Sequence, residues 1–394
     1  MDRRTLLKSM AALPVAAAGN LWAAPASRTR LLFVFMRGGY DATSLLVPIS
    51  SQYYYQVRPN IAIARPSDDL KSALPINGDW GLHPALRDTI YPLFQQGQAA
   101  FVPFAGTEDL SRSHFETQDS IELGQALDRR RDFRSGFLNR LASTLNADRA
   151  SAISFTDQLP LIMQGDLQVP NTALRSVAKP AVDARQAKMI AAMYEGTALA
   201  QPVREGFTVR EDVMKEMVGE MEAANRNAIT AKGFELEARR IAKVMRERYN
   251  IGFVDVGGWD THVGQGNATG YLANRLEELG RGLAGFAQEM GPDWKDTVVV
   301  VVSEFGRTFR ENGNRGTDHG HGSVYWVLGG GINGGKVHGE QVRLEQPTLF
   351  QNRDYPVLNE YRAMFGGLLA RMYGLNAGQI DTIFGTRGRD LSLV

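Results

Sequence analysis

The sequence predicts an α/β fold with a mostly parallel central sheet and helices on both of its faces. Its 394 residues are 43% hydrophobic and 22% charged, a globular composition that excludes disordered and collagen-like chains. Several short runs are apolar at every position, as expected of strands buried on both faces of a parallel sheet. Stretches with helical spacing of apolar residues separate these runs, so strand and helix alternate.

We expect the strands at residues 31–36, 99–104, 251–254, 297–302 and 324–328. Residues 271–290 are predicted to form a helix, because apolar side chains recur three and four positions apart and Gly291-Pro292 follows as a stop. A second helix is expected to open at the capping box Thr208-Val209-Arg210-Glu211 and to continue towards Arg248.

The N-terminus has the features of an export signal. Arg3-Arg4 precedes a short apolar run from Met10 to Ala18, and Ala24-Pro25-Ala26 has the small residues of a cleavage site. An amphipathic helix is the alternative, but Pro14 breaks the run, which is too short to span a bilayer. We predict a twin-arginine signal at 1–26, passage through the twin-arginine translocase, and a periplasmic or exported mature chain without a transmembrane anchor.

The mature chain, residues 27–394, is expected to be a single α/β domain with an inserted segment near 150–250, since residues 150–205 have no clear periodicity. The net charge of +1 argues against a nucleic-acid partner. The absence of cysteine excludes thiolate metal sites and cysteine nucleophiles, and it leaves histidines and carboxylates as the strong metal ligands.

Polar clusters follow the predicted strands, where open α/β sheets carry their binding sites. Four of the six histidines lie in these loops. Imidazole and carboxylate donors suit a divalent transition metal. The candidate metal ligands are Asp41, Asp260, His262, Glu304, Asp318, His319 and His321.

Each candidate ligand also has a structural interpretation. Asp41 and Asp260 are suitable helix caps, and Glu304 is a suitable partner for Arg307. A histidine-rich turn is often simply part of the surface. The metal hypothesis depends on the conjunction, because donors of one chemical class follow several different strands.

The segment Ser111-Arg112-Ser113-His114 carries the candidate catalytic residues Ser113, Arg112 and His114. Ser113 with Glu116 three positions later is an ordinary capping box. The same helix start would stabilise an anion, a nearby metal would activate the hydroxyl, and Arg112 would clamp a phosphate or sulfate. Thr43 and Ser44 are the rival nucleophiles.

Two other histidines and a glycine-rich run are assigned structural roles. His83 precedes Pro84 and is expected to cap or pack, and His338 is expected on a surface hairpin. Residues 329–335 are rich in glycine but lack the Gly-Lys-Ser/Thr of a phosphate loop, which indicates a turn.

The motifs Phe-Met-Arg-Gly-Gly-Tyr-Asp, Ser-Arg-Ser-His-Phe, Gly-Gly-Trp-Asp-Thr-His and Asp-His-Gly-His-Gly resemble the exported domain-of-unknown-function family 1501. That family more remotely resembles the alkaline phosphatase and sulfatase superfamily. The resemblance implies a metal-binding sheet edge with Asp41, Asp260, His262 and His319 or His321 as ligands and Ser113 as nucleophile. Glu304-Phe305 departs from the superfamily, which usually has Asp-His after this strand.

We therefore predict a periplasmic, metal-dependent hydrolase of phosphate or sulfate esters that acts on a small-molecule or glycan ester. The expected cofactor is a divalent metal, zinc first, with magnesium, calcium and manganese as the other candidates. Asp41, Asp260, His262, His319 and His321 are expected to converge in one or two adjacent coordination spheres. The alternative is a non-catalytic, metal-stabilised exported binding or assembly protein.

Overall fold

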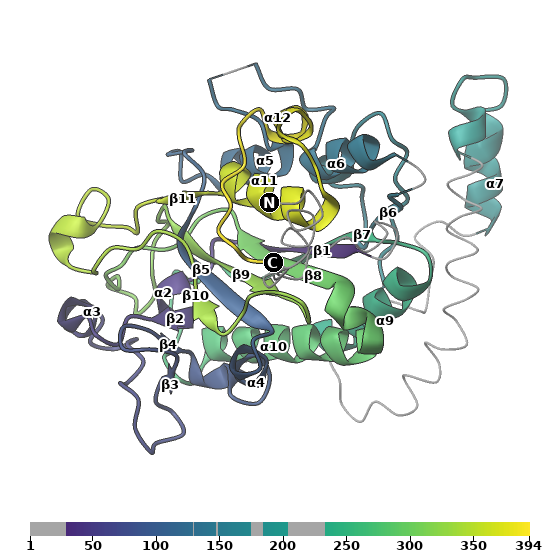
Figure 1. Ribbon diagram of the computed structural model, residues 1–394. Helices are drawn as coiled ribbons and strands as arrows, with labels where there is room; N and C mark the ends of the chain where they lie inside the picture. Colours follow the sequence, from purple (N-terminus) through teal and green to yellow (C-terminus); the bar gives the residue numbers. More distant parts are fainter. Residues whose placement is uncertain (1–28, 129, 147–148, 175–183, 204–232) are drawn as a thin grey trace, which may run out of the picture.

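A central sheet of eight strands organises the chain (Figure 1). The computed structural model describes residues 29–128, 130–146, 149–174, 184–203 and 233–394. The strand order is β10-β5-β9-β8-β1-β7-β6, and β11 pairs with β5. The strands are β1 (Arg30–Arg37), β5 (Ala99–Gly106), β6 (Ala152–Ser154), β7 (Ile251–Gly257), β8 (Thr297–Ser303), β9 (Ser323–Leu328), β10 (Lys336–Val337) and β11 (Asn359–Glu360).

The sheet is mostly parallel, as predicted, and β9 is the exception. β9 pairs antiparallel with both β5 and β8, whereas β1 pairs parallel with β7 and β8. The carboxyl ends of β1, β5, β7 and β8 therefore lie at the same edge as the amino end of β9. This places the loop before β9, which holds Asp318 and His319, beside the loops that follow the parallel strands.

All five predicted strands are confirmed, and burial on both faces explains their uniformly apolar sequences. In β1, Leu32, Val34 and Met36 join one hydrophobic cluster. Leu31, Phe33 and Phe35 join a second cluster on the opposite face.

Helices cover both faces of the sheet (Figure 1). The first cluster receives side chains from α4 (Ile90–Gln95), α9 (Phe234–Glu247) and α10 (Tyr271–Met290), and the second from α5 (His114–Leu123), α6 (Phe137–Leu145), α11 (Tyr361–Tyr373) and α12 (Ala377–Phe384). Other α-helices of the described residues are α2 (Ala42–Leu45), α3 (Gln52–Val57) and α7 (Ala184–Met193). The prediction of a helix at 271–290 is confirmed.

Parts of the predicted insertion near 150–250 that the structure describes contribute to the main sheet and its covering layer. Strand β6 pairs with β7, and α9 packs on the sheet. The expected capping box at Thr208–Glu211 and the predicted signal at 1–26 both lie outside the described residues. A small antiparallel sheet joins β2 (Leu46–Val47), β4 (Gly81–Leu82) and β3 (Leu74–Pro75). Within the described ranges, no helix combines the length and apolar character needed to cross a membrane.

His83 has the capping and packing role predicted for it. Its fully buried ring accepts a hydrogen bond from Ala85 N through Nδ1 (3.1 Å), and its Nε2 lies 3.1 Å from Asn267 O. Because the carbonyl can only accept, Nε2 carries the proton and the ring is neutral. Burial lowers the pKa of His83 to about 4.

This buried histidine should make the protein sensitive to acid. Between pH 6.5 and about 4, unfolded His83 takes up a proton that the folded form does not, so the free energy of unfolding should fall as pH falls. The contribution is up to about 3 kcal/mol, since each pKa unit corresponds to about 1.4 kcal/mol. His83→Asn keeps an acceptor without titrating. In urea unfolding, the advantage of wild type over this variant should shrink from pH 7 to pH 4, and a constant difference would contradict the assignment.

Candidate metal centre

The loops that meet at the carboxyl edge approach one another closely at Gly38, just after β1. Gly38 has φ +126°, and a Cβ there would lie 2.9 Å from the backbone nitrogen of Asp260. Glycine is therefore required by both its conformation and the space available. This contact sets the loop after β7, which carries Asp260 and His262, against the end of β1.

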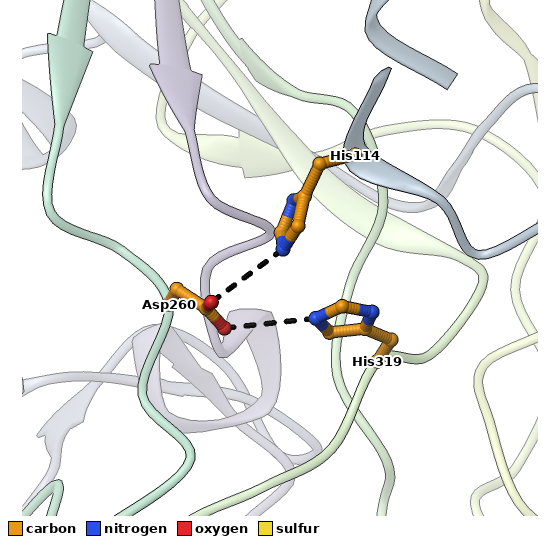
Figure 2. Close-up of side chains that lie close together, drawn as sticks. All are labelled: His114, Asp260 and His319. Carbon is orange, nitrogen blue, oxygen red and sulfur yellow. Dashed lines mark ion pairs between the residues drawn. The ribbon is translucent and has the colours of Figure 1, made fainter. Parts of the chain in front are cut away.

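Three side chains from different loops form the centre of the site (Figure 2). His114 begins α5, Asp260 follows β7, and His319 precedes β9. His114 Nε2 lies 3.6 Å from Asp260 Oδ2, and His319 Nε2 lies 3.7 Å from Asp260 Oδ1. One ligand atom from each residue lies within 4.8 Å of the other two, which is compatible with a shared metal ion.

His262 adds a third imidazole to this group. Its Nε2 lies 3.0 Å from Asp260 Oδ1 and 3.1 Å from His319 Nε2. Three imidazoles and one carboxylate therefore face one small volume at the sheet edge. We name His114, Asp260, His262 and His319 the donor cluster.

The outer nitrogen of each imidazole faces an oxygen acceptor. His114 Nδ1 lies 2.8 Å from Glu304 Oε1, His319 Nδ1 lies 3.0 Å from the carbonyl oxygen of Arg112, and His262 Nδ1 lies 3.3 Å from Asp318 Oδ1. Each Nδ1 accordingly carries a proton and donates it. Fixing one ring nitrogen in this way orients the other for metal binding.

Glu304 is well suited to hold His114, because it is fully buried and multiply hydrogen-bonded. Burial alone would raise the pKa of this carboxyl, but hydrogen bonds from His114, Gln118 and Ser303 lower it overall. The resulting carboxylate can only accept hydrogen bonds. Its hydrogen bond to His114 is the largest of the effects that raise the pKa of that imidazole.

Arg307 neutralises Asp260 from beneath the donor cluster. Its buried guanidinium donates to Asp260 Oδ1 and to the carbonyl oxygens of Gly38 and Gly39. Although burial acts in the opposite direction, the hydrogen bond and charge of Arg307 lower the pKa of Asp260. The expected pairing of Arg307 with Glu304 is therefore replaced by pairing with Asp260.

When the rings are neutral, these proton positions leave lone pairs on the inner nitrogens. With Nδ1 carrying the only proton of the ring, His262 Nε2 can accept from Arg307 Nη1 (3.4 Å), but it then faces a second acceptor, Asp260 Oδ1, at 3.0 Å. His319 Nε2, 3.1 Å from His262 Nε2, is also unprotonated in the neutral ring, and burial lowers the pKa of His319. His114 Nε2 is buried without a hydrogen-bond partner among the described residues. Facing lone pairs repel unless a proton or a metal cation lies between them, so the donor set fits a divalent metal.

Two of the predicted ligands lie apart from the donor cluster. Both oxygens of the fully buried Asp41 accept from Arg58, at 2.5 Å from Nη1 and 3.0 Å from Nη2. Asp41 makes no side-chain cap either, so its role is an internal ion pair. His321 is buried against Phe350 with ring centroids 5.0 Å apart, and burial lowers its pKa to about 4. The structure thus corrects the expected convergence: Asp260, His262 and His319 meet, whereas Asp41 and His321 do not join them.

The three candidate catalytic residues, Arg112, Ser113 and His114, have different roles in the structure. His114 is a donor, whereas Arg112 Nε and Nη2 both bind Asp354 Oδ2, at 3.0 and 2.6 Å. The guanidinium is therefore already paired, and the backbone carbonyl of Arg112 is what reaches the site. Ser113 is half-buried at the N-cap position of α5, but its hydroxyl makes no capping hydrogen bond. The rivals Thr43 and Ser44 are 2% and 1% exposed, too enclosed to meet a substrate.

Sequence reasoning missed several residues that build the site. Arg58 and Gln265 carry no motif, and only their contacts with Asp41 reveal them. Gln118 donates to Glu304 Oε1 (2.9 Å) from α5, one turn after His114. The spacing of four residues between His114 and Gln118 was the available signal, since positions i and i+4 lie on one helix face.

Comparison with known proteins gives a family model and several solved structures. The family model described as "Protein of unknown function (DUF1501)" matches residues 28–384. None of the curated proteins matches the chain significantly. A crystal structure of Ps i-CgsB in complex with k-i-k-neocarrahexaose is similar to this chain with 8% identity and a TM-score of 0.40, covering 92% of this chain and 75% of that one. A protein in the alkaline phosphatase superfamily from Vibrio parahaemolyticus gives 10% identity and a TM-score of 0.38, with 92% and 69% covered.

Proposed function

The chain belongs to the DUF1501 family, and from its own site we propose that it is a metal-dependent hydrolase of phosphate or sulfate esters, acting in the periplasm. The observation that carries this proposal is the donor cluster, in which three imidazole nitrogens and a carboxylate converge. Zinc is the metal we expect first, because it favours imidazole and carboxylate ligands. The paired arginines at Arg3-Arg4 support export, which fractionation of cells would test.

His114, Asp260, His262 and His319 would hold the metal. When bound, the cation would lower the pKa of a nearby hydroxyl and offset the charge of the transferred group. Glu304, Asp318 and the Arg112 carbonyl keep the outer ring nitrogens protonated, so that the inner ones present lone pairs. Arg307 keeps Asp260 ionised.

Ser113 is the nucleophile we propose. It precedes the donor His114 at the start of α5, where first-turn N–H groups lack intrahelical acceptors and attract anions. The Ser113 hydroxyl would lose its proton to solvent as its oxygen bonds to phosphorus or sulfur, while the bond to the leaving alcohol breaks and the alcohol oxygen takes a proton from solvent. Water would then release phosphate or sulfate and restore the hydroxyl.

A pocket at the same edge of the sheet could receive the alcohol part of the ester. It encloses about 900 Å³ of empty space, part of it open to solvent, and its lining includes Arg37, Gln158 and Asp255. Gln118 connects the two regions, since it accepts from Arg37 (2.9 Å) and donates to Glu304 (2.9 Å). The polar lining of this pocket suits a small-molecule or glycan ester.

Metal analysis of protein purified without chelator tests the proposal. Wild type should contain about one divalent ion per chain, and His319→Ala should lower metal affinity by at least about 100-fold, because even indirect contacts are worth 10–100-fold. His338→Ala is the matched control, since His338 bonds the Leu391 and Asn333 carbonyls away from the cluster. Equal metal content in wild type and His319→Ala would rule out the site.

One observation favours the second candidate, a metal-stabilised binding or assembly protein. The Arg112 guanidinium is bound to Asp354 and is therefore not available to clamp the transferred group. Metal-loaded wild type should be offered aryl phosphate and aryl sulfate esters. Hydrolysis of either supports the enzyme, and failure to hydrolyse any member of such a panel favours the binding protein.

A further inference from the structure

A buried polar network beneath the donor cluster centres on Gln265. This residue lies between β7 and α10 and is 0% exposed. Its Nε2 donates to Asp41 Oδ2 (2.7 Å), and its Oε1 accepts from the hydroxyls of Thr261 and Thr317, each at 3.1 Å. Both ends of the amide are therefore bonded, and both threonines are buried as well.

The two threonines belong to the two loops that supply most of the donors. Thr261 lies between Asp260 and His262, and Thr317 lies two residues before His319. The backbones of these loops also meet, since Thr317 N donates to Thr261 O (3.0 Å). Gln265 Oε1 thus links Thr261 of one loop to Thr317 of the other, and each threonine lies within two residues of a ligand.

The ion pair of Asp41 and Arg58 fixes which way the amide points. Arg58 also donates to the carbonyls of Phe309 (2.6 Å) and Thr308 (2.9 Å), so this pair is anchored to the surrounding chain. An ionised carboxylate only accepts, and therefore the NH₂ group of Gln265 must face Asp41. The amide oxygen of Gln265 therefore faces the hydroxyls of Thr261 and Thr317, which donate to it.

We infer that Gln265 is a positioning residue that sets the separation of the two donor-bearing loops and thereby the geometry of the proposed metal site. The effect of Gln265 on metal binding rests on the proposed function, whereas its effect on the two loops does not. The coupling of the two loops through Gln265 is a property of the metal-free chain.

Unfolding in urea tests the coupling without metal. Thr261→Val and Thr317→Val keep side-chain shape and remove the hydroxyls. Their effects on the free energy of unfolding should be non-additive with Gln265 present and additive in a Gln265→Met background, because methionine fills the space without accepting from either threonine. Additive effects with Gln265 present would overturn the inference, whether or not the protein binds metal. Thr317→Ser should restore wild-type behaviour.

Cobalt binding tests the consequence for the site. Gln265→Met should lower Co²⁺ affinity by about 10–100-fold and change the visible absorption of the bound ion, as expected when the support of ligands is lost. Ser44→Ala is the matched control: Ser44 donates to Asp41 (2.7 Å) and accepts from Gln265 Nε2 (3.4 Å), so it belongs to the same network but bonds neither threonine. It should retain affinity and spectrum. Wild-type affinity and spectrum in Gln265→Met would overturn the positioning role, whereas a wild type that binds no Co²⁺ would instead overturn the proposed metal site.

Discussion

Replacing Asp41 with asparagine should lower the free energy of unfolding by about 3–5 kcal/mol, because it leaves the charge of Arg58 buried without a counter-charge. Arg58 is 0% exposed and binds both oxygens of Asp41. Burial would raise the pKa of Asp41, but the charge and hydrogen bonds of Arg58 lower it overall. Urea unfolding at neutral pH measures the loss.

Two controls distinguish an ion pair from a metal ligand. The loss caused by Asp41→Asn should persist in EDTA, whereas loss of a ligand would disappear once wild type had also lost its metal. The double variant Asp41→Leu with Arg58→Met should be more stable than the sum of the single effects, since neither charge remains alone. A loss below about 1 kcal/mol for Asp41→Asn, typical of exposed pairs, would contradict the internal ion pair.

Much of the fold could be predicted from local sequence. Uniformly apolar runs identify strands buried on both faces, and the large apolar residues of α10 repeat at helical spacing over its whole length. The antiparallel direction of β9 could not be predicted in this way, because an apolar run reads the same in either direction. Because β9 runs antiparallel, His319, which lies before β9, reaches the edge where the parallel strands end.

The loops that carry the site could be predicted from the sequence, but the partners of the individual side chains could not. The carboxyl-edge rule brings together Asp260, His262 and His319. Asp41 satisfies the same rule, yet its partner Arg58 lies 17 residues away in a position that no pattern marks. His114 was assigned to catalysis beside Ser113, and its role as a ligand is indicated by the position of its Nε2 near Asp260 and of Glu304 behind its ring.

Ser113→Ala should lower the turnover of a phosphate or sulfate ester by at least about 1,000-fold, because it removes the covalent route. The free energy of unfolding should change by less than about 1 kcal/mol, the usual value of a cap, since the Ser113 hydroxyl makes no capping hydrogen bond. Metal content should be unchanged, which separates this variant from His319→Ala. Steady-state kinetics, metal analysis and urea unfolding of the same preparation provide the three measurements.

Ser111→Ala is the neighbouring control: Ser111 is an exposed serine whose hydroxyl lies beside Thr117 (3.3 Å) and accepts from Ser113 N (3.3 Å), so the variant removes a hydroxyl that supports the segment without attacking the ester. It should retain most of the turnover. If Ser113→Ala hydrolyses the ester at nearly the wild-type rate, a covalent serine intermediate is excluded. The attacking group would then be water, because Thr43 and Ser44 are buried and Ser44 already donates to Asp41. To attack a substrate, the Ser44 hydroxyl would have to leave both its hydrogen bond to Asp41 and its buried position.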